Sequence, residues 1–191
     1  VECHCYKRVA TEAGEDPAHN PLDYILESLQ TINSTKPANG AIRRVNVNIA
    51  ATTEDAYRQL KAAEIGTYIL FQGTYHRARY EELHPSGPKA NYAWHTEAHD
   101  RAMAAGIDDV GLGVLFGLEG YAYEFAGLLM HAEHLEAVFG LGPHTLSVPP
   151  VQPASAHDPH PFDNGLPDEM LEKIIPLNPI QLTHTGHKPT T

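Results

Sequence analysis

A carboxylate stands at a position in this sequence where a ligand with a positive charge could be held. Glu15 belongs to the run Ala-Gly-Glu-Asp-Pro at 13–17, directly after a predicted first strand. Ligands of α/β folds bind at the carboxyl edge of the strands, so this carboxylate could accept hydrogen bonds from an ammonium group. A helix-capping turn is an equally good interpretation of the same five residues.

The segment 42–49 has two different faces. Apolar residues at 45, 47 and 49 alternate strictly with Arg44, Asn46 and Asn48. A parallel strand covered on both faces normally reads as a continuous apolar run, so one face of this strand should meet a polar environment. The simplest structure is a barrel in which Arg44, Asn46 and Asn48 point into a lumen that holds a polar ligand.

Two further groups of residues could line such a lumen. Gly111 and Gly113 fall on one face of the predicted fourth strand, where a bare backbone lets a planar ligand approach, although relief of crowding explains them equally well. Gln72, Tyr75 and His76 follow the predicted third strand, where polar groups could orient a substrate. A solvated loop is the competing interpretation.

Two histidine pairs raise a metal hypothesis. His95 and His99 are four residues apart, and His131 and His134 are three apart, which can place two imidazoles on one metal. Neither pair has a cysteine or a clear carboxylate at ligand spacing, so we expect structural or solvent-facing histidines. The sequence contains no Ser-His-Asp elbow, P-loop or GxGxxG motif.

Strand and helix patterns alternate along the chain and must position these residues. Strands are predicted at 8–13, 42–49, 66–71, 108–116 and 145–148. The helices between them are predicted from Asn20, as cap, to Ile32, from Thr52 or Thr53 to Ala63, at 92–105 with Gly106 as C-cap, and at 121–139. The fold class is therefore α/β, a partial TIM-type barrel. Five strands cannot close a barrel of eight, so the chain is expected to be truncated at its front.

Composition limits the domain organisation and the partners. We expect a partial barrel over 1–153 and, after a change to a proline-rich texture, an irregular tail with one short helix over 154–191. The net charge of -11 argues against nucleic acid and anionic membranes as partners. No apolar run reaches the roughly 18 to 20 residues of a membrane span, so a cytoplasmic location is predicted. Cys3 and Cys5 are too close for an easy mutual disulfide.

Many ordered segments resemble one known family. They are Gly-Glu-Asp-Pro at 14–17, Ile-Arg-Arg-Val-Asn-Val-Asn-Ile-Ala at 42–50, Gly-Thr-Tyr at 66–68, Thr-Tyr-His at 74–76, Leu-His-Pro at 83–85, Gly-Pro-Lys at 87–89, Asp-Arg-Ala-Met at 100–103, Gly-Ile-Asp-Asp-Val-Gly at 106–111, Val-Leu-Phe-Gly-Leu at 114–118, His-Ala-Glu-His-Leu-Glu at 131–136 and Gly-Pro-His-Thr at 142–145. Together they resemble the radical S-adenosylmethionine tyrosine lyase that matures FeFe-hydrogenase. The thiazole-synthesis tyrosine lyase and biotin synthase are more distant relatives of this pattern.

The resemblance implies an activity, cofactors and site residues. It implies a barrel of the radical S-adenosylmethionine kind with a 4Fe-4S cluster, cleaving tyrosine to p-cresol and dehydroglycine, the source of CO and cyanide ligands. Tyrosine would be the substrate, and other hydrogenase maturation proteins the partners. The resemblance assigns the cofactor to Glu15, Asn46, Asn48, Arg101, Gly111 and Gly113, and tyrosine to Gln72, Tyr75, His76 and Ser147. The region 154–191 resembles the start of the family's C-terminal biotin and thiamin synthase-associated region.

The sequence also departs from the family pattern. The family's cluster ligands, Cys-x3-Cys-x2-Cys, lie upstream of the strand that begins here near Arg8, and the Cys-x-Cys spacing of Cys3 and Cys5 does not match them. No metal ligand is therefore expected in this chain. Pro150 and Gln152 replace two family arginines. Two alternatives stay open: a non-catalytic, degenerate fragment that binds a small molecule or a partner chain, and a metal-dependent barrel hydrolase.

Overall fold

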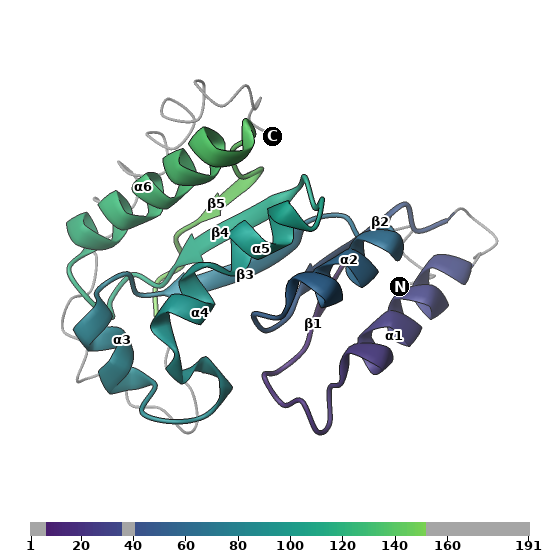
Figure 1. Ribbon diagram of the computed structural model, residues 1–191, viewed down its shortest axis with the longest axis horizontal. Helices are drawn as coiled ribbons and strands as arrows, with labels where there is room; N and C mark the ends of the chain where they lie inside the picture. Colours follow the sequence, from purple (N-terminus) through teal and green to yellow (C-terminus); the bar gives the residue numbers. More distant parts are fainter. Residues whose placement is uncertain (1–6, 36–40, 152–191) are drawn as a thin grey trace. The chain divides into compact units, whose positions relative to one another are not determined.

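The computed structural model describes residues 7–35 and 41–151 (Figure 1). Cys3, Cys5, Gln152 and the predicted tail at 154–191 lie outside the described residues. The elements in chain order are β1 (Arg8–Glu12), α1 (Leu22–Ser34), β2 (Arg44–Asn48), α2 (Glu54–Ala62), β3 (Tyr68–Gly73), α3 (Arg77–Leu83), the 3-10 helix η2 (Pro88–Ala90), α4 (Tyr92–Thr96), α5 (Ala98–Ala104), β4 (Val110–Val114), α6 (Tyr121–Phe139) and β5 (Thr145–Ser147).

The strands form a five-stranded sheet in the order β1-β2-β3-β4-β5, and a helix connects each strand to the next. β1 pairs with β2, and β2 with β3, in parallel. The bonds from Tyr68 N to Asp109 O (2.9 Å) and from Leu115 N to Gly73 O (2.8 Å) continue this direction along β3 and β4. Sequential parallel strands with intervening helices are the arrangement of (β/α) barrels, which confirms the predicted α/β class.

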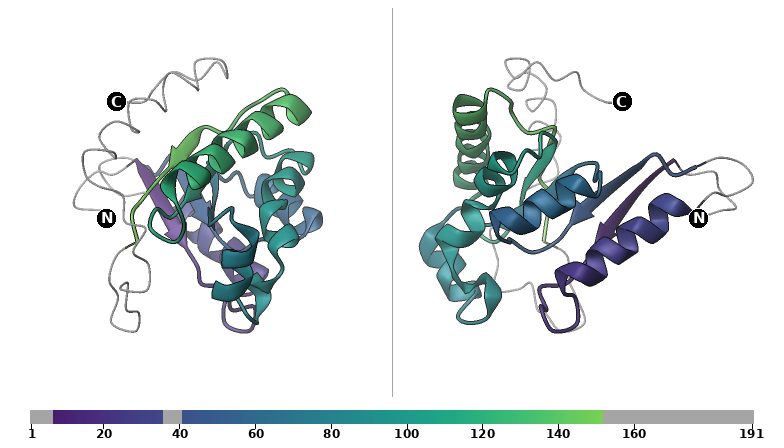
Figure 2. Two further views of the ribbon diagram at one scale, coloured as in Figure 1. Left: turned by 90° about the vertical axis from the view of Figure 1, so that its left-hand side faces the viewer. Right: turned by 45° about the vertical axis from the view of Figure 1, so that its right-hand side comes forward.

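Close contacts divide the chain into two compact units, the first within Val1–Leu70 and Ser86–Gly111 and the second within Phe71–Pro85 and Leu112–Thr191. In the first unit α1 contacts β2 and α2, and α2 contacts α5. Figure 2 shows α1 running alongside β1 and β2. The core of this unit comprises Ile25, Leu29, Val45, Val47, Ile49, Ala56, Tyr57, Leu60, Tyr68, Leu70, Ala98, Ala102, Met103, Ile107 and Val110.

The second unit contains α3, α6, β5 and the ends of β3 and β4. α6 lies beside β5 (Figures 1 and 2). Its buried side includes Leu128, Ala132 and Leu135, which recur at helical spacing, and the helix ends at Gly140 with a φ of 73°. The rest of this core comprises Tyr75, Tyr80, Leu112, Val114, Phe116 and Leu118.

The predicted two-faced strand is confirmed. Val45 and Val47 of β2 are buried, whereas Arg44, Asn46 and Asn48 between and beside them are only half-buried. By contrast β4, which lies beyond β3 in the strand order, is buried along its whole length, as expected of a strand covered on both faces.

Helix ends differ from the predictions at two places. Thr53 caps α2 as predicted, its hydroxyl accepting the Ala56 N–H at 3.3 Å. Asn20 does not cap α1: Pro21 holds the cap position, and the Asn20 amide instead donates to the Gly14 carbonyl. The predicted helix at 92–105 is two helices, α4 and α5, joined at Glu97. None of the helices in the described ranges has the length and apolar composition that a membrane crossing requires.

Candidate functional site

A cleft of about 200 Å³ opens in the first unit where β1 and β2 end. Its walls come from the residues after β1, the start of α1, the residues after β2, and the 3-10 helix. They are Ala13, Gly14, Glu15, Asp16, Pro17, Asn20, Pro21, Leu22, Ile25, Ile49, Ala50, Ala51, Thr52 and Pro88. This is the carboxyl edge of two parallel strands, where α/β folds bind their ligands.

Glu15 brings a negative charge to this mostly apolar cleft. Its side chain is half-buried, and within residues 7–35 and 41–151 its carboxylate makes no hydrogen bond or ion pair. A carboxylate that is partly removed from water gains most from a cationic partner that donates hydrogen bonds. The cleft therefore offers a site for an ammonium group with an apolar body attached.

The neighbouring Asp16 is occupied by its own loop. Asp16 Oδ1 accepts the His19 N–H at 3.2 Å, and Asp16 Oδ2 lies 2.7 Å from His19 Nδ1. The His19 side chain is the main cause of a lowered pKa for the Asp16 carboxyl group. Asn20 Nδ2 donates to the Gly14 carbonyl at 3.4 Å and ties the two ends of this loop together. Of the two adjacent acids, Glu15 is thus the one available to a ligand.

The opposite wall, from Ile49 to Thr52, is fixed from behind by two buried tyrosines. The Tyr57 hydroxyl accepts the Thr52 N–H at 3.2 Å and donates to the Tyr68 hydroxyl at 2.8 Å. Tyr68 in turn donates to the Ile49 carbonyl at 3.3 Å. Burial raises the pKa of both phenols, so both stay protonated and both hold backbone atoms of the cleft.

Arg101 supports the same wall. Its Nε donates to the Thr52 carbonyl at 3.0 Å and its Nη2 donates to the Trp94 carbonyl, while the guanidinium carbon lies 3.8 Å from the centre of the Trp94 ring. These contacts take the guanidinium behind the cleft rather than into its lining. Its predicted role in cofactor binding stays a prediction.

Asn46 lies in a polar cluster near the amino ends of the strands. Asn46 Oδ1 accepts the Arg44 Nε–H at 3.2 Å and the Thr67 N–H at 3.1 Å. Arg44 Nη2 also donates to Thr67 Oγ1 at 3.0 Å and pairs with Asp109. The Arg44–Asp109 ion pair, which the sequence analysis missed, thus occupies part of the polar face that was expected to hold a ligand.

Asn48 and Gly111 complete the predicted cofactor residues of the first unit. Asn48 Nδ2 donates to Glu12 Oε1 at 3.1 Å, across the register that pairs these two residues of β1 and β2. The Gly111 carbonyl accepts the Nε2–H of the buried His99 at 3.1 Å. Neither residue lines the cleft around Glu15.

The second unit contains Gly113 and the predicted substrate residues. A Cβ atom on Gly113 would lie 2.3 Å from Cδ1 of Phe71, so the Phe71 ring already covers its bare face. Gln72 and Tyr75 are buried, and the Tyr75 hydroxyl lies 3.0 Å from Nδ1 of His131. Ser147 is half-buried at the end of β5.

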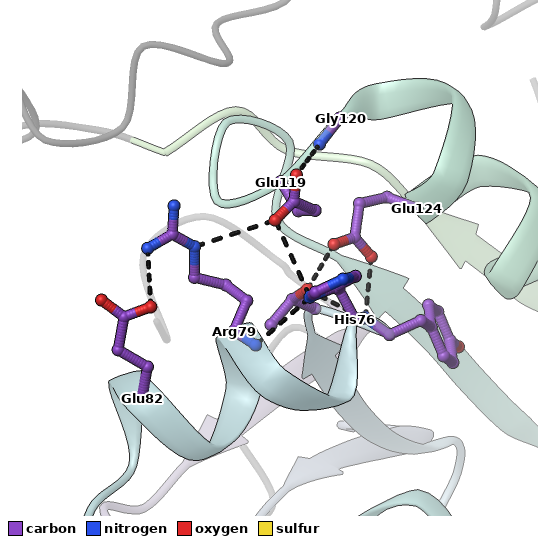
Figure 3. Close-up of polar contacts among 8 residues, drawn as sticks. His76, Arg79, Glu82, Glu119, Gly120 and Glu124 are labelled. Atoms are coloured by element: carbon purple, nitrogen blue, oxygen red, sulfur yellow. Dashed lines mark hydrogen bonds and ion pairs between the residues drawn. The ribbon is translucent and has the colours of Figure 1, made fainter.

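His76 is surrounded by charged side chains after the end of β3 (Figure 3). Glu119 Oε2 lies 3.8 Å from His76 Nδ1 and 3.9 Å from Arg79 Nε. Glu124 is fully buried beside them; its Oε1 accepts a hydrogen bond from the Thr74 hydroxyl and its Oε2 accepts the Tyr75 N–H at 2.7 Å. Burial raises the pKa of Glu124. The sequence analysis missed both acids: Glu124 stands in the first turn of α6, where an acid is favoured by the helix dipole without any buried partner, and Glu119 precedes the helix.

The histidine pairs are not alike. His131 is buried and His134 is exposed, so the first is structural and the second faces solvent, in keeping with the expectation from the sequence. His95 and His99 are both buried, on different helices, so both are structural rather than solvent-facing. Among the residues that the structure describes, no group of three His, Cys, Asp or Glu side chains could hold a metal ion.

No family model matches the sequence. A crystal structure of HydG, a maturase of the FeFe-hydrogenase, is 55% identical with a TM-score of 0.88, covering 91% of this chain and 38% of that chain. HydG from Carboxydothermus hydrogenoformans is 40% identical with a TM-score of 0.81, covering 94% of this chain and 41% of its own. Methylornithine synthase, at 15% identity and a TM-score of 0.61, shares the fold alone.

Two curated proteins named 2-iminoacetate synthase are also similar. The one from Salmonella typhimurium is 31% identical over 122 residues, covering 61% of this chain and 31% of its own length. The one from Escherichia coli is 25% identical over 151 residues, covering 78% and 38%. This chain thus spans about a third of the length of these relatives. With sequence segments, strand order and two HydG structures in agreement, the chain belongs to the radical S-adenosylmethionine tyrosine lyase family of HydG and 2-iminoacetate synthase.

Proposed function

We propose that this chain supplies an S-adenosylmethionine site and a tyrosine-binding edge to a tyrosine lyase of hydrogenase maturation. The observation that carries the proposal is the Glu15 carboxylate, half-buried in the cleft and without a hydrogen-bond partner in the described part of the chain. S-adenosylmethionine offers an α-ammonium group that donates the hydrogen bonds this carboxylate lacks.

The size and lining of the cleft support the methionine end of the cofactor as occupant. A volume of about 200 Å³ is below the roughly 300 to 1,000 Å³ of sites that enclose a whole small molecule. The walls beyond Glu15 include Pro17, Ile25, Ile49 and Pro88, which suit an aliphatic chain. Glu15 would bind the ammonium group, and the wall fixed by Tyr57, Tyr68 and Arg101 would keep its shape.

The part of the chain that the structure describes does not fit an iron–sulfur cluster. Residues 7–35 and 41–151 contain no cysteine, so none of them offers the thiolate ligand that such clusters require. In this family the bound cofactor supplies the radical chemistry. The residues of this chain would bind and orient S-adenosylmethionine and the substrate.

The tyrosine end of the proposal rests on the second unit. Gln72, Tyr75, His76 and Ser147 follow or end strands of the sheet, and His76 is half-exposed between charged groups. We assign them to the substrate tyrosine, whose cleavage would give p-cresol and dehydroglycine. Other hydrogenase maturation proteins as partners, and a cytoplasmic location, belong to the same proposal.

Calorimetric titration of S-adenosylmethionine into the chain and into Glu15→Gln tests the cofactor site. Loss of a charge-assisted hydrogen bond should weaken binding by about 1.5 to 3 kcal/mol, or roughly 10- to 150-fold in Kd. The matched control is Glu27→Gln, an exposed acid on α1 that lies outside the cleft, which should leave Kd unchanged. Equal affinities of the wild type and Glu15→Gln would contradict the proposal.

A further inference from the structure

Glu124 is a buried acid whose carboxylate accepts two hydrogen bonds from the segment that carries His76. It lies in the first turn of α6 and is 0% exposed. One carboxylate oxygen accepts the Thr74 hydroxyl and the other accepts the Tyr75 N–H at 2.7 Å. Thr74 Oγ1 in turn accepts the N–H of His76 at 3.1 Å. Glu124 thus fixes the backbone on the amino side of His76 through two successive residues.

The His76 ring is fixed from its carboxyl side. His76 is the N-cap of α3, and its Nδ1 accepts the Arg79 N–H at 3.2 Å. A ring nitrogen that accepts a hydrogen bond carries no proton. Neutral His76 in this arrangement therefore has its proton on Nε2, and this N–H is the donor that the ring can offer to a ligand.

A competing arrangement of the same ring is close at hand. Glu119 Oε2 lies 3.8 Å from His76 Nδ1, beyond ordinary hydrogen-bond distance. If His76 moved toward Glu119 by about 0.6 Å or more, Nδ1 could hold a proton and donate a hydrogen bond to Glu119, and the cap of α3 would be lost. The position of the His76 backbone thus decides between the two tautomers.

We propose that Glu124 is a positioning residue that holds the Thr74–His76 segment so that His76 stays an Nε2–H donor at the carboxyl edge of the sheet. The donor would suit an anionic or carbonyl oxygen of the ligand. This inference rests on the proposed function only in naming tyrosine as that ligand. The tautomer itself is a property of the free chain.

The test is a long-range proton–nitrogen NMR spectrum of the full chain labelled with ¹⁵N-histidine, at a pH where the imidazoles are neutral. Wild type should show an unprotonated Nδ1 and a protonated Nε2 for His76. Glu124→Gln should match it, because the Gln oxygen can accept the Tyr75 N–H while its amide donates to Thr74. Glu124→Ala should shift both nitrogens toward averaged values, and exchange of the Arg79 amide should rise roughly tenfold.

Two further variants make the result decisive. Glu133→Ala removes an exposed acid from the same helix and should leave both readouts unchanged. Thr74→Val replaces the hydroxyl between Glu124 and His76 by a methyl group and should give the changes expected for Glu124→Ala, so it tests the inference if Glu124→Ala fails to fold. An unchanged His76 tautomer and unchanged Arg79 exchange in Thr74→Val, or in a folded Glu124→Ala, would overturn the inference. Failure of added tyrosine to move the His76 signals of wild type would instead refute the substrate assignment alone.

Discussion

Replacing Arg101 should cost much more stability than replacing another arginine of the first unit. The Arg101 guanidinium donates to the carbonyls of Thr52 and Trp94 and stacks on the Trp94 ring. Hydrogen bonds to charged groups contribute about 1.5 to 3 kcal/mol each, and an exposed cation–π contact about 0.5 to 1 kcal/mol. These contributions do not add fully, so we expect Arg101→Ala to lower the free energy of unfolding by about 2 to 4 kcal/mol.

Arg58 provides the matched control for this prediction. It forms ion pairs with Glu54 and Asp55 on the surface of α2, where its side chain is 55% exposed. Exposed ion pairs contribute about 0 to 1 kcal/mol. Urea denaturation should therefore separate Arg101→Ala from Arg58→Ala by at least about 1 kcal/mol. Arg101→Lys should recover only part of the loss, because an ammonium group cannot reach both carbonyls and the ring together. Equal losses for the two alanine variants would refute the proposed support of the cleft wall.

Two other variants test packing and charge in the second unit. Gly113→Ala places a Cβ atom 2.3 Å from the Phe71 ring, so thermal unfolding should show a free energy of unfolding lower by about 1 to 3 kcal/mol. The control Gly120→Ala, whose Cβ meets no atom within 4 Å, should lower it less. Equal losses for the two variants would argue against the Phe71 contact. Glu124 has a pKa raised above 4.5, mainly by burial, so the native state keeps its proton to higher pH than the unfolded state. The free energy of unfolding of wild type, relative to Glu124→Gln, should therefore fall as pH rises from about 4.5 through the raised pKa and then level off. A constant difference across that pH range would contradict a raised pKa for Glu124.

The strands and helices of the fold could largely be predicted from local sequence patterns. The alternation around Val45 and Val47 predicted a strand with one polar face, and the structure has that strand. The apolar spacing from 121 to 139 predicted the bounds of α6 as observed. Both are properties of neighbouring residues, which a sequence displays directly.

The polar contacts could not be predicted in the same way, because their partners lie far apart in the chain. Glu124 accepts a hydrogen bond from Thr74, a residue 50 positions away, and Arg44 pairs with Asp109 across 65 positions. The spacing of apolar residues along the chain does not indicate which distant polar residues will pair. Asn20 shows that even a contact between residues close in the chain can be mispredicted. Its amide donates to the Gly14 carbonyl instead of capping the helix, since Pro21 already sets the backbone angle that begins α1.

A crystal structure of the chain with S-adenosylmethionine tests the proposed cofactor site most directly. We predict the α-ammonium nitrogen within hydrogen-bond distance of a Glu15 carboxylate oxygen, about 2.7 to 2.9 Å, with the methionine chain between the Pro17 loop and the wall at Ile49–Thr52. The Thr52 carbonyl should keep its bond to Arg101. Cofactor bound elsewhere, or in the cleft with its ammonium group turned away from Glu15, would contradict the assignment of this cleft.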